Sequence, residues 1–107
     1  MRVTTAVARV LRAFLEDPGA PRYGFDLMRS TGLPSGTLYP ILARLERCGW
    51  VVSRSERIDP AAAGRPPRRF YELTEHGLRA GRRELTALSE ELRLPAPGRL
   101  IPRSDPA

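Results

Sequence analysis

The stretch from Thr31 to Trp50, TGLPSGTLYPILARLERCGW, has the form of a turn followed by one amphipathic helix. Gly32 can adopt a positive φ, and Pro34 keeps the residue before it out of the helical region, so we expect a turn there. Four aliphatic side chains then recur at the spacing of one buried helical face: Leu38, Ile41, Leu42 and Leu45. Gly49 can end the helix in the left-handed region, and Trp50 begins an apolar, β-prone run.

The opposite face of this helix is polar and mostly basic, and it carries Thr37, Tyr39, Arg44 and Arg47. A helix that is held to a core by one face, and that offers hydrogen-bond donors and positive charge on the other, suits the major groove of DNA. Arg44 is the expected base contact, whereas Arg47 is expected to meet phosphate or solvent. The alternative for both arginines is solvated charge on an exposed helix face.

Pro40 restricts where this helix can begin. A proline inside a helix removes one backbone hydrogen bond and clashes with the preceding turn, but it is tolerated in the first turn. We therefore expect the regular helix to begin near Tyr39, after an irregular or 3₁₀ start over residues 35–38. The side chain of Ser35 or Thr37 is expected to accept hydrogen bonds from the free N–H groups at this start.

Two more helices are predicted upstream. Thr4 or Thr5 can cap a first helix that runs to about Glu16, with a buried stripe formed by Val7, Val10, Leu11, Phe14 and Leu15. A short second helix from Tyr23 to about Ser30 would place Phe25, Leu27 and Met28 against the helix that follows the turn. Two helices joined by a turn containing Gly32 form a helix-turn-helix, with the second helix in the reading position.

Residues after Trp50 predict a β-hairpin. Trp50 to Arg57 is partly alternating and β-branched, residues 59–67 (DPAAAGRPP) form a flexible tip, and Arg68 to Leu73 returns as a second strand. In the returning strand, Phe70 and Glu72 should face one side, and Arg69, Tyr71 and Leu73 the other. The predicted fold is mainly α with a small β-hairpin, a winged helix-turn-helix.

Basic residues cluster on this hairpin: Arg54, Arg57, Arg65, Arg68 and Arg69. The net charge of +6 and the pI near 10.9 favour a polyanionic partner. All 18 basic residues are arginine and the chain has no lysine, asparagine or glutamine, which resembles a GC-rich coding bias. The placement of the arginines is therefore stronger evidence than their number. Base readout without amides must use arginine on guanine, hydroxyls, or apolar contact with thymine methyls.

A last helix should begin after Thr74 and run to Leu94. Leucines recur along it on a heptad-like seam: Leu78, Leu85, Leu88 and Leu92. We expect this C-terminal dimerisation helix to pair with a second copy, together with Val7 and Phe14 of the first helix. The predicted organisation is thus a DNA-binding domain over residues 1–73, a dimerisation helix over residues 74–94, and a disordered proline-rich tail over residues 95–107.

Several classes of protein are disfavoured. No apolar run approaches the roughly 20 residues of a membrane span, and no signal peptide is expected. A single cysteine, Cys48, allows no internal disulfide, which suits the cytoplasm. Its alternatives are a redox switch and a small apolar residue. His76 has no second histidine at ligand spacing, and the glutamates show no paired arrangement. We therefore expect no metal, no cofactor, no catalytic residue and no enzyme activity.

Three strings together resemble the PadR family of bacterial transcriptional regulators: YGFDLMRSTGL, SGTLYPILARLERCGWV and GRPPRRFYELTEHG, within residues 23–77. The resemblance implies a winged helix that dimerises through its C-terminal helix and represses transcription. Because some members respond to small aromatic or drug-like ligands, it also implies a small aromatic effector. The family pattern places residues 37–40 at the start of the reading helix and residues 64–66, with Arg68 and Arg69, in the wing. This chain departs from the family in two ways: the segment between Tyr23 and Thr31 is short, and the helix after the wing is short as well.

The predicted DNA contacts are Tyr23, Ser35, Thr37, Tyr39, Arg44, Arg47, Arg54, Arg65, Arg68 and Arg69. Wing arginines would bind phosphate or the minor groove. Helix capping or core packing is the alternative for Tyr39, and strand pairing or core packing is the alternative for Tyr23. The residues favour a sequence-specific DNA-binding regulator, acting as a homodimeric repressor on a palindromic operator. The alternative is a winged-helix protein-interaction module that does not bind DNA.

Overall fold

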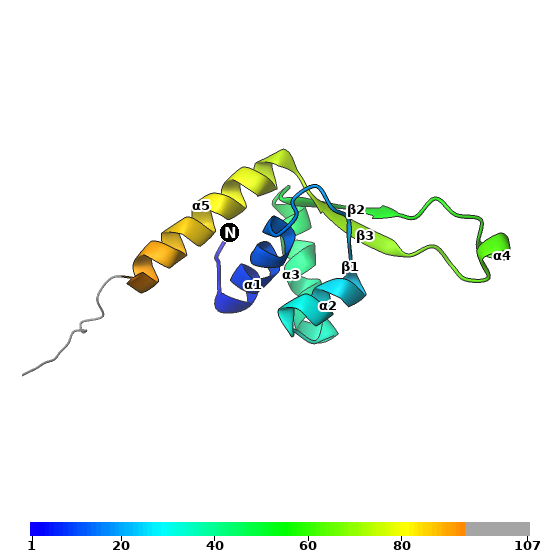
Figure 1. The fold of residues 1–107 in the computed structure, drawn as a ribbon, viewed down its shortest axis with the longest axis horizontal. Coiled ribbons are helices and arrows are strands. Elements are labelled where there is room, and N and C mark those ends of the chain that lie inside the picture. Colours follow the sequence, from blue (N-terminus) through cyan, green and yellow to red (C-terminus); the bar gives the residue numbers. More distant parts are fainter. Residues whose placement is uncertain (94–107) are drawn as a thin grey trace, which may run out of the picture.

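The helices and strands of the computed structural model, which describes residues 1–93, form a winged helix-turn-helix followed by one long helix (Figure 1). The elements are α1 (Thr5–Leu15), β1 (Arg22–Tyr23), α2 (Gly24–Thr31), α3 (Ser35–Arg47), β2 (Val51–Ser55), α4 (Pro60–Ala63), β3 (Arg69–Leu73) and α5 (Glu75–Arg93). Helices α1 to α3 form a group from which the β2–β3 hairpin projects on one side, while α5 runs away on the other. The predicted tail over residues 95–107 lies outside the described residues.

The core is built from the faces that the apolar periodicity predicts. Val7, Val10, Leu11 and Phe14 of α1 pack with Leu38, Ile41, Leu42 and Leu45 of α3, and all eight are at most 3% exposed. The Oγ1 of Thr4 caps α1 by accepting a hydrogen bond from the Val7 N–H at 3.2 Å. Leu15 is only half-buried. Trp50 anchors the lower end of the hairpin in this core, as expected, with 7% exposed.

Helix α3 begins at Ser35, so the prediction of a start near Tyr39 is wrong. Pro34 occupies the N-cap position, and its carbonyl accepts hydrogen bonds from the N–H groups of Thr37 and Leu38 at 3.0 and 2.9 Å. The bond from Leu38 is the first regular helical bond, so the backbone of Pro34, rather than a Ser35 or Thr37 side chain, satisfies one of the free donors, the Thr37 N–H. Pro40 lies inside the helix with its ring exposed. One missing backbone bond is offset because the four buried side chains hold both halves of α3 to the same core.

A third strand, β1, was not expected. The sheet is antiparallel in the order β1-β3-β2, with Arg22 opposite Tyr71 and Tyr23 opposite Phe70. Tyr23 has extended backbone angles and precedes α2, which starts one residue later than predicted. Two residues are too few for an alternating pattern to be visible in the sequence. Strand β1 ties the start of α2 to the centre of the wing, which we define as residues 51–73.

Two other expectations are corrected by the structure. Phe25 is 64% exposed rather than packed against α3, whereas Leu27 is buried and Met28 is half-buried. The guanidinium of Arg29 lies 5.8 Å from the centre of the Phe25 ring. The tip of the wing is not wholly irregular, because Asp59 caps the short helix α4 by accepting from the Ala61 N–H at 3.1 Å.

The backbone of Trp50 joins α3, β2 and α5. Its N–H donates to the Leu45 carbonyl of α3 at 2.9 Å, and its carbonyl accepts from the Thr74 N–H at 3.0 Å. The Thr74 hydroxyl donates to the Gly49 carbonyl at 2.6 Å and caps α5 by accepting from the Gly77 N–H at 2.9 Å. A Cβ on Gly77 would overlap the Trp50 carbonyl. Gly77 therefore allows a close approach within one chain.

Gly77→Ala should destabilise the protein by about 1–3 kcal/mol, because the added methyl group meets fixed backbone and pushes α5 away from Trp50. Thermal unfolding measures the loss. Gly81→Ala is the matched control: its Cβ would make ordinary contacts with Leu11 and Leu15, and alanine favours the helix by up to about 1 kcal/mol. Equal effects of the two substitutions would contradict the close approach.

Candidate nucleic-acid interface

The first turn of α3 is exposed, and it carries the hydroxyls of Ser35 and Thr37. Arg44 lies in the last turn of the helix, about 13.5 Å along the axis from Ser35 at 1.5 Å per residue. Arg44 is half-buried and Arg47 is exposed. In helix-turn-helix proteins the N-terminal residues of the second helix contact the base edges, which places the hydroxyls ahead of Arg44.

Beside this turn lies a pocket of about 290 Å³, which we call the aromatic pocket. It is lined by Tyr23, Gly24, Phe25, Tyr39, Arg68, Arg69 and Tyr71. A Cβ on Gly24 would overlap the hydroxyl of Tyr39, so a glycine at the start of α2 allows that ring to lie over it. The helix-turn-helix and the wing thus contribute side chains to the same concave surface.

Two tyrosines of the aromatic pocket, Tyr23 and Tyr71, have pKa values raised by their surroundings. Burial, with a smaller contribution from Tyr39, raises the pKa of Tyr71 above its ordinary value. Burial and the hydrogen bond to Glu56 raise the pKa of Tyr23 as well. Hydroxyl groups beside the guanidinium groups of Arg68 and Arg69 make this surface more favourable for an anion than for a cation.

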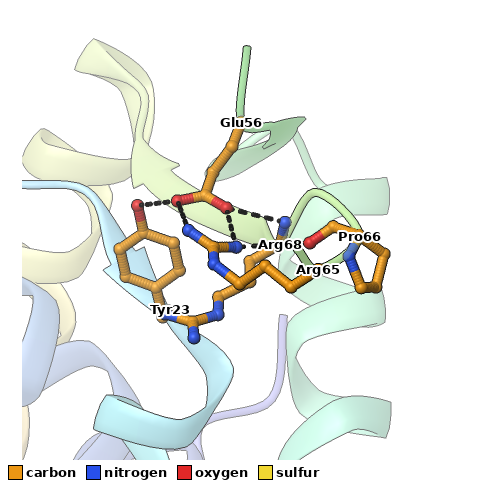
Figure 2. Close-up of polar contacts among 5 residues, drawn as sticks. All are labelled: Tyr23, Glu56, Arg65, Pro66 and Arg68. Atoms are coloured by element: carbon orange, nitrogen blue, oxygen red, sulfur yellow. Dashed lines mark hydrogen bonds and ion pairs between the residues drawn. The ribbon is translucent and has the colours of Figure 1, made fainter. Parts of the chain in front are cut away.

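Glu56 collects four hydrogen bonds at the base of the wing loop (Figure 2). Its Oε1 accepts from Arg65 Nη1 at 2.7 Å and from the Arg68 backbone N–H at 2.9 Å. Its Oε2 accepts from the Tyr23 hydroxyl at 3.2 Å and from Arg65 Nη2 at 3.4 Å. The bond from Arg65, followed by that from the Arg68 N–H, lowers the pKa of Glu56 to about 2. We call these four residues the Glu56 clamp.

The remaining wing arginines differ in how far their charge is compensated. Arg54 forms an exposed ion pair with Glu72 at 2.9 Å. Arg69 donates to the Ser53 hydroxyl at 2.8 Å, and that hydroxyl donates to Glu46 of α3 at 2.7 Å. Arg57 and Arg68 are exposed, and neither side chain forms an ion pair within residues 1–93.

The structure therefore separates six of the predicted DNA contacts into two groups: those around the aromatic pocket and those paired with a carboxylate. Tyr23, Tyr39, Arg68 and Arg69 come together around the aromatic pocket. Arg54 and Arg65 instead face carboxylates of their own chain. Phe25 lines the aromatic pocket, and Glu56 contacts two of its lining residues, Tyr23 and Arg68; neither was predicted as a site residue. The one visible signal for Glu56 was its position as a carboxylate among the arginines of a basic hairpin.

A second concave surface, the α1–α5 groove, has a volume of about 480 Å³. Its apolar lining comes from Ala8, Leu85, Leu88 and Leu92, with Thr5, Arg9, Arg12, Ser89 and Arg93 around them. Leu92 is 76% exposed. Val7 and Phe14 are only 0% and 1% exposed within the single chain, so the core already covers these two predicted interface residues. Leu78 is half-buried, and Gly81 faces α1.

Among residues 1–93, no three histidine, cysteine, aspartate or glutamate side chains lie together as metal ligands, and no helix is long and apolar enough to cross a bilayer. His76 meets the edge of the Trp50 ring, with the ring centres 6.3 Å apart. Cys48 is exposed at the C-cap of α3 and contributes nothing to the core.

The fold and this surface are those of a winged-helix transcriptional regulator. The chain belongs to the transcriptional regulator PadR-like family, whose profile matches residues 13–87. No curated protein matches the chain in sequence.

Solved structures with a similar fold include a PadR-like transcription factor from Bacteroides fragilis, with 25% identity, a TM-score of 0.66 and 82% of each chain covered. A PadR family regulator from Eggerthella lenta is 28% identical, with a TM-score of 0.61 over 82% of this chain and 78% of that one. AbfR, solved in its overoxidized form bound to DNA, is 27% identical, with a TM-score of 0.66 over 86% of this chain and 62% of its own.

The lowered pKa of Glu56 predicts a dependence of stability on pH. A carboxylate whose pKa falls on folding stabilises the native state above its unfolded pKa of 4.5, and this contribution is lost as pH falls towards about 2. The Tm of the wild type should therefore exceed that of Glu56→Gln by a constant amount above pH 4.5. The difference should close as the solution is acidified. A difference in Tm that stays constant down to about pH 2 would contradict the clamp.

Proposed function

We propose that this protein is a sequence-specific DNA-binding regulator that represses transcription as a homodimer by occluding a palindromic operator. The observation that carries the proposal is the aromatic pocket, where Tyr39 of α3, the start of α2, and Arg68 and Arg69 of the wing line one concave surface beside the exposed first turn of α3. Membership of a family of transcriptional regulators supports it.

In this proposal the aromatic pocket receives a phosphate of the DNA backbone. Tyr23 caps α2 without a side-chain hydrogen bond, so the first N–H groups of this helix are free to point at an anion. Tyrosine hydroxyls and arginines are common phosphate donors, and such contacts fix the register of the protein on the duplex. A phosphate held there would bring the first turn of α3 to the base edges.

Sequence would be read by the hydroxyls of Ser35 and Thr37, with Arg44 and Arg47 further along the same helix. Hydroxyl groups can both donate and accept, and the methyl group of Thr37 can contact a thymine methyl. Because the chain lacks asparagine and glutamine, adenine cannot be read by the usual bidentate amide contact. The operator should therefore favour guanine and thymine at its contacted positions.

Replacing Arg68 and Arg69 together by alanine should weaken binding to every DNA sequence. The slope of log affinity against log salt should become less steep by about 0.9 for each phosphate that the variant no longer binds. Replacing Arg82 and Arg83 on the exposed side of α5 is the control, since it removes the same charge far from the wing. Salt titrations that give the same slope for both double variants would refute the proposed interface.

We further propose that the α1–α5 groove is occupied by the final turns of α5 from a second copy. Leu88 and Leu92 lie on the open side of α5, and burying each would contribute about 1.5–3 kcal/mol. Two-fold pairing would place two reading helices about 34 Å apart, which is one turn of DNA. The partner helix and a small aromatic effector would compete for this apolar surface, and the leucine seam favours the helix.

Leu88→Asp together with Leu92→Asp should give a monomer that loses preference for a palindromic site and keeps its fold. Sedimentation and DNA titration measure the two effects. Thr86→Asp with Ala87→Asp, both exposed positions on α5, adds the same charge outside the groove and should leave the dimer intact. A wild-type chain that sediments as a monomer at micromolar concentration would exclude the dimer.

The protein-interaction module remains the second candidate because of one observation. Phe25 is 64% exposed at the rim of the aromatic pocket, where an apolar side chain could anchor a protein partner. Phe25→Ser separates the two candidates. A DNA-binding protein should retain most of its affinity for DNA, whereas an interaction module should lose its partner and show no salt-dependent DNA binding.

A further inference from the structure

We propose that Glu56 acts as an internal substitute for a DNA phosphate. It pairs with the guanidinium of Arg65 at the base of the wing loop. The wing then contributes a fixed shape to DNA binding, and the charge of Arg65 is not available to a DNA phosphate. Glu56 is then a positioning residue that raises specificity, and Arg65, although it lies in the basic wing, makes no contact with DNA. This inference rests on the proposed DNA-binding function.

The contacts of Arg65 are those that an arginine makes to a phosphate. Its Nη1 and Nη2 reach the two oxygens of Glu56 at 2.7 and 3.4 Å, a two-point pairing that planar guanidinium groups form with carboxylate and phosphate alike (Figure 2). Nη1 also donates to the Pro66 carbonyl at 3.2 Å. The Arg65 side chain is 34% exposed and the Glu56 side chain only 14%. The guanidinium is therefore already engaged before DNA arrives.

Glu56 also closes the wing loop. Its backbone N–H donates to the Arg68 carbonyl at 2.9 Å, and its carboxylate accepts from the Arg68 N–H at 2.9 Å. These two bonds join the chain on either side of the loop over residues 57–67. The Tyr23 hydroxyl adds a contact from β1, outside the hairpin. The backbone position of Arg68, which lines the aromatic pocket, thus depends on Glu56.

The other acidic residue paired with a wing arginine is a useful contrast. Glu72 meets Arg54 through one contact at 2.9 Å, and their side chains are 33% and 63% exposed. An exposed pair of this kind contributes little and opens readily, so Arg54 can exchange Glu72 for a phosphate. Glu56 makes four hydrogen bonds and is mostly buried. Only Glu56 combines charge compensation with loop closure.

Removing the two carboxylates should therefore have different consequences. Glu72→Gln frees Arg54 and should steepen the salt slope by at most about 0.9, with no change in specificity. Glu56→Gln frees Arg65 and also loosens the loop. Its salt slope should steepen by about the same amount, while the ratio of specific to non-specific affinity falls by about tenfold, as for one mismatched base pair. A residue with a purely structural role would not make binding more dependent on salt.

The arginines supply an independent comparison. Arg65→Gln removes the guanidinium that Glu56 holds and should leave the salt slope unchanged. Arg68→Gln removes an exposed guanidinium from the same loop and should flatten the slope by about 0.9. The two substitutions remove the same charge from positions three residues apart, so overall charge cannot account for a difference.

The experiment uses the full chain and two duplexes: one recovered from a random-sequence library by the wild-type protein, and a scrambled duplex of the same composition. Affinities for both are measured across salt concentrations for the wild type and the four single variants, with circular dichroism melts to establish folding. A steeper slope with lower specificity in Glu56→Gln, and an unchanged slope in Arg65→Gln, would support the inference. If Glu56→Gln does not fold, the comparison of Arg65→Gln with Arg68→Gln decides alone.

Two results would overturn it. If Arg65→Gln flattens the salt slope as much as Arg68→Gln, Arg65 contacts phosphate and Glu56 does not withhold it, although the proposed DNA binding would stand. If the library yields no duplex that the wild type prefers, the proposed function itself fails and this inference fails with it.

Discussion

Three functional parts of the chain meet at the backbone of Trp50. Its N–H donates a hydrogen bond to the Leu45 carbonyl of α3, and its side chain packs in the core. Its carbonyl accepts a hydrogen bond from the Thr74 N–H at the start of α5. Gly77 lets α5 approach this carbonyl directly, and the Thr74 hydroxyl satisfies both the Gly49 carbonyl and the first turn of α5. Because hydrogen bonds and close packing act at one place, the directions of α3, the wing and α5 are set together. A change at this junction would move all three.

Apolar periodicity was enough to predict much of the fold, whereas the hydrogen bonds and ion pairs between side chains could not be predicted from the sequence. The buried stripes of α1 and α3 were predicted correctly, except that Leu15 is only half-buried, because a helix packed on a core must repeat its apolar residues at this spacing. The start of α3 was wrong because tertiary burial on both sides of Pro40 outweighed one missing backbone bond. Strand β1 was missed because two residues carry no pattern, and its partner, Tyr71, lies 49 positions away from Arg22 in the chain.

In the candidate site, too, the pairing of polar side chains could not be predicted from the sequence. Five arginines on one hairpin look equivalent in the sequence, yet Arg65 faces Glu56, Arg54 faces Glu72, and Arg69 reaches Ser53. Whether a given arginine is paired depends on where the carboxylates lie. Their positions follow from the strand register and the path of the loop, which local composition does not predict. Gathering the tyrosines with Arg68 and Arg69 in one pocket likewise required β1 beside β3. Residue type was enough to predict a polyanionic ligand, whereas the fold is needed to see which of these arginines already have a partner within the chain.

The central position of β3 has a consequence for how a regulator of this design can change. Since β3 pairs with β2 on one side and with the strand leading into α2 on the other, the sheet joins the wing to the helix-turn-helix. Under the proposed function, the two would meet DNA as one unit. The wing and the helix-turn-helix could then not move separately to fit a new half-site. In the dimer we propose, the distance between the winged helices of the two copies would instead depend on the length and direction of α5. Base preference and half-site spacing would then be encoded in separate segments of the chain, and one could be altered without disturbing the other.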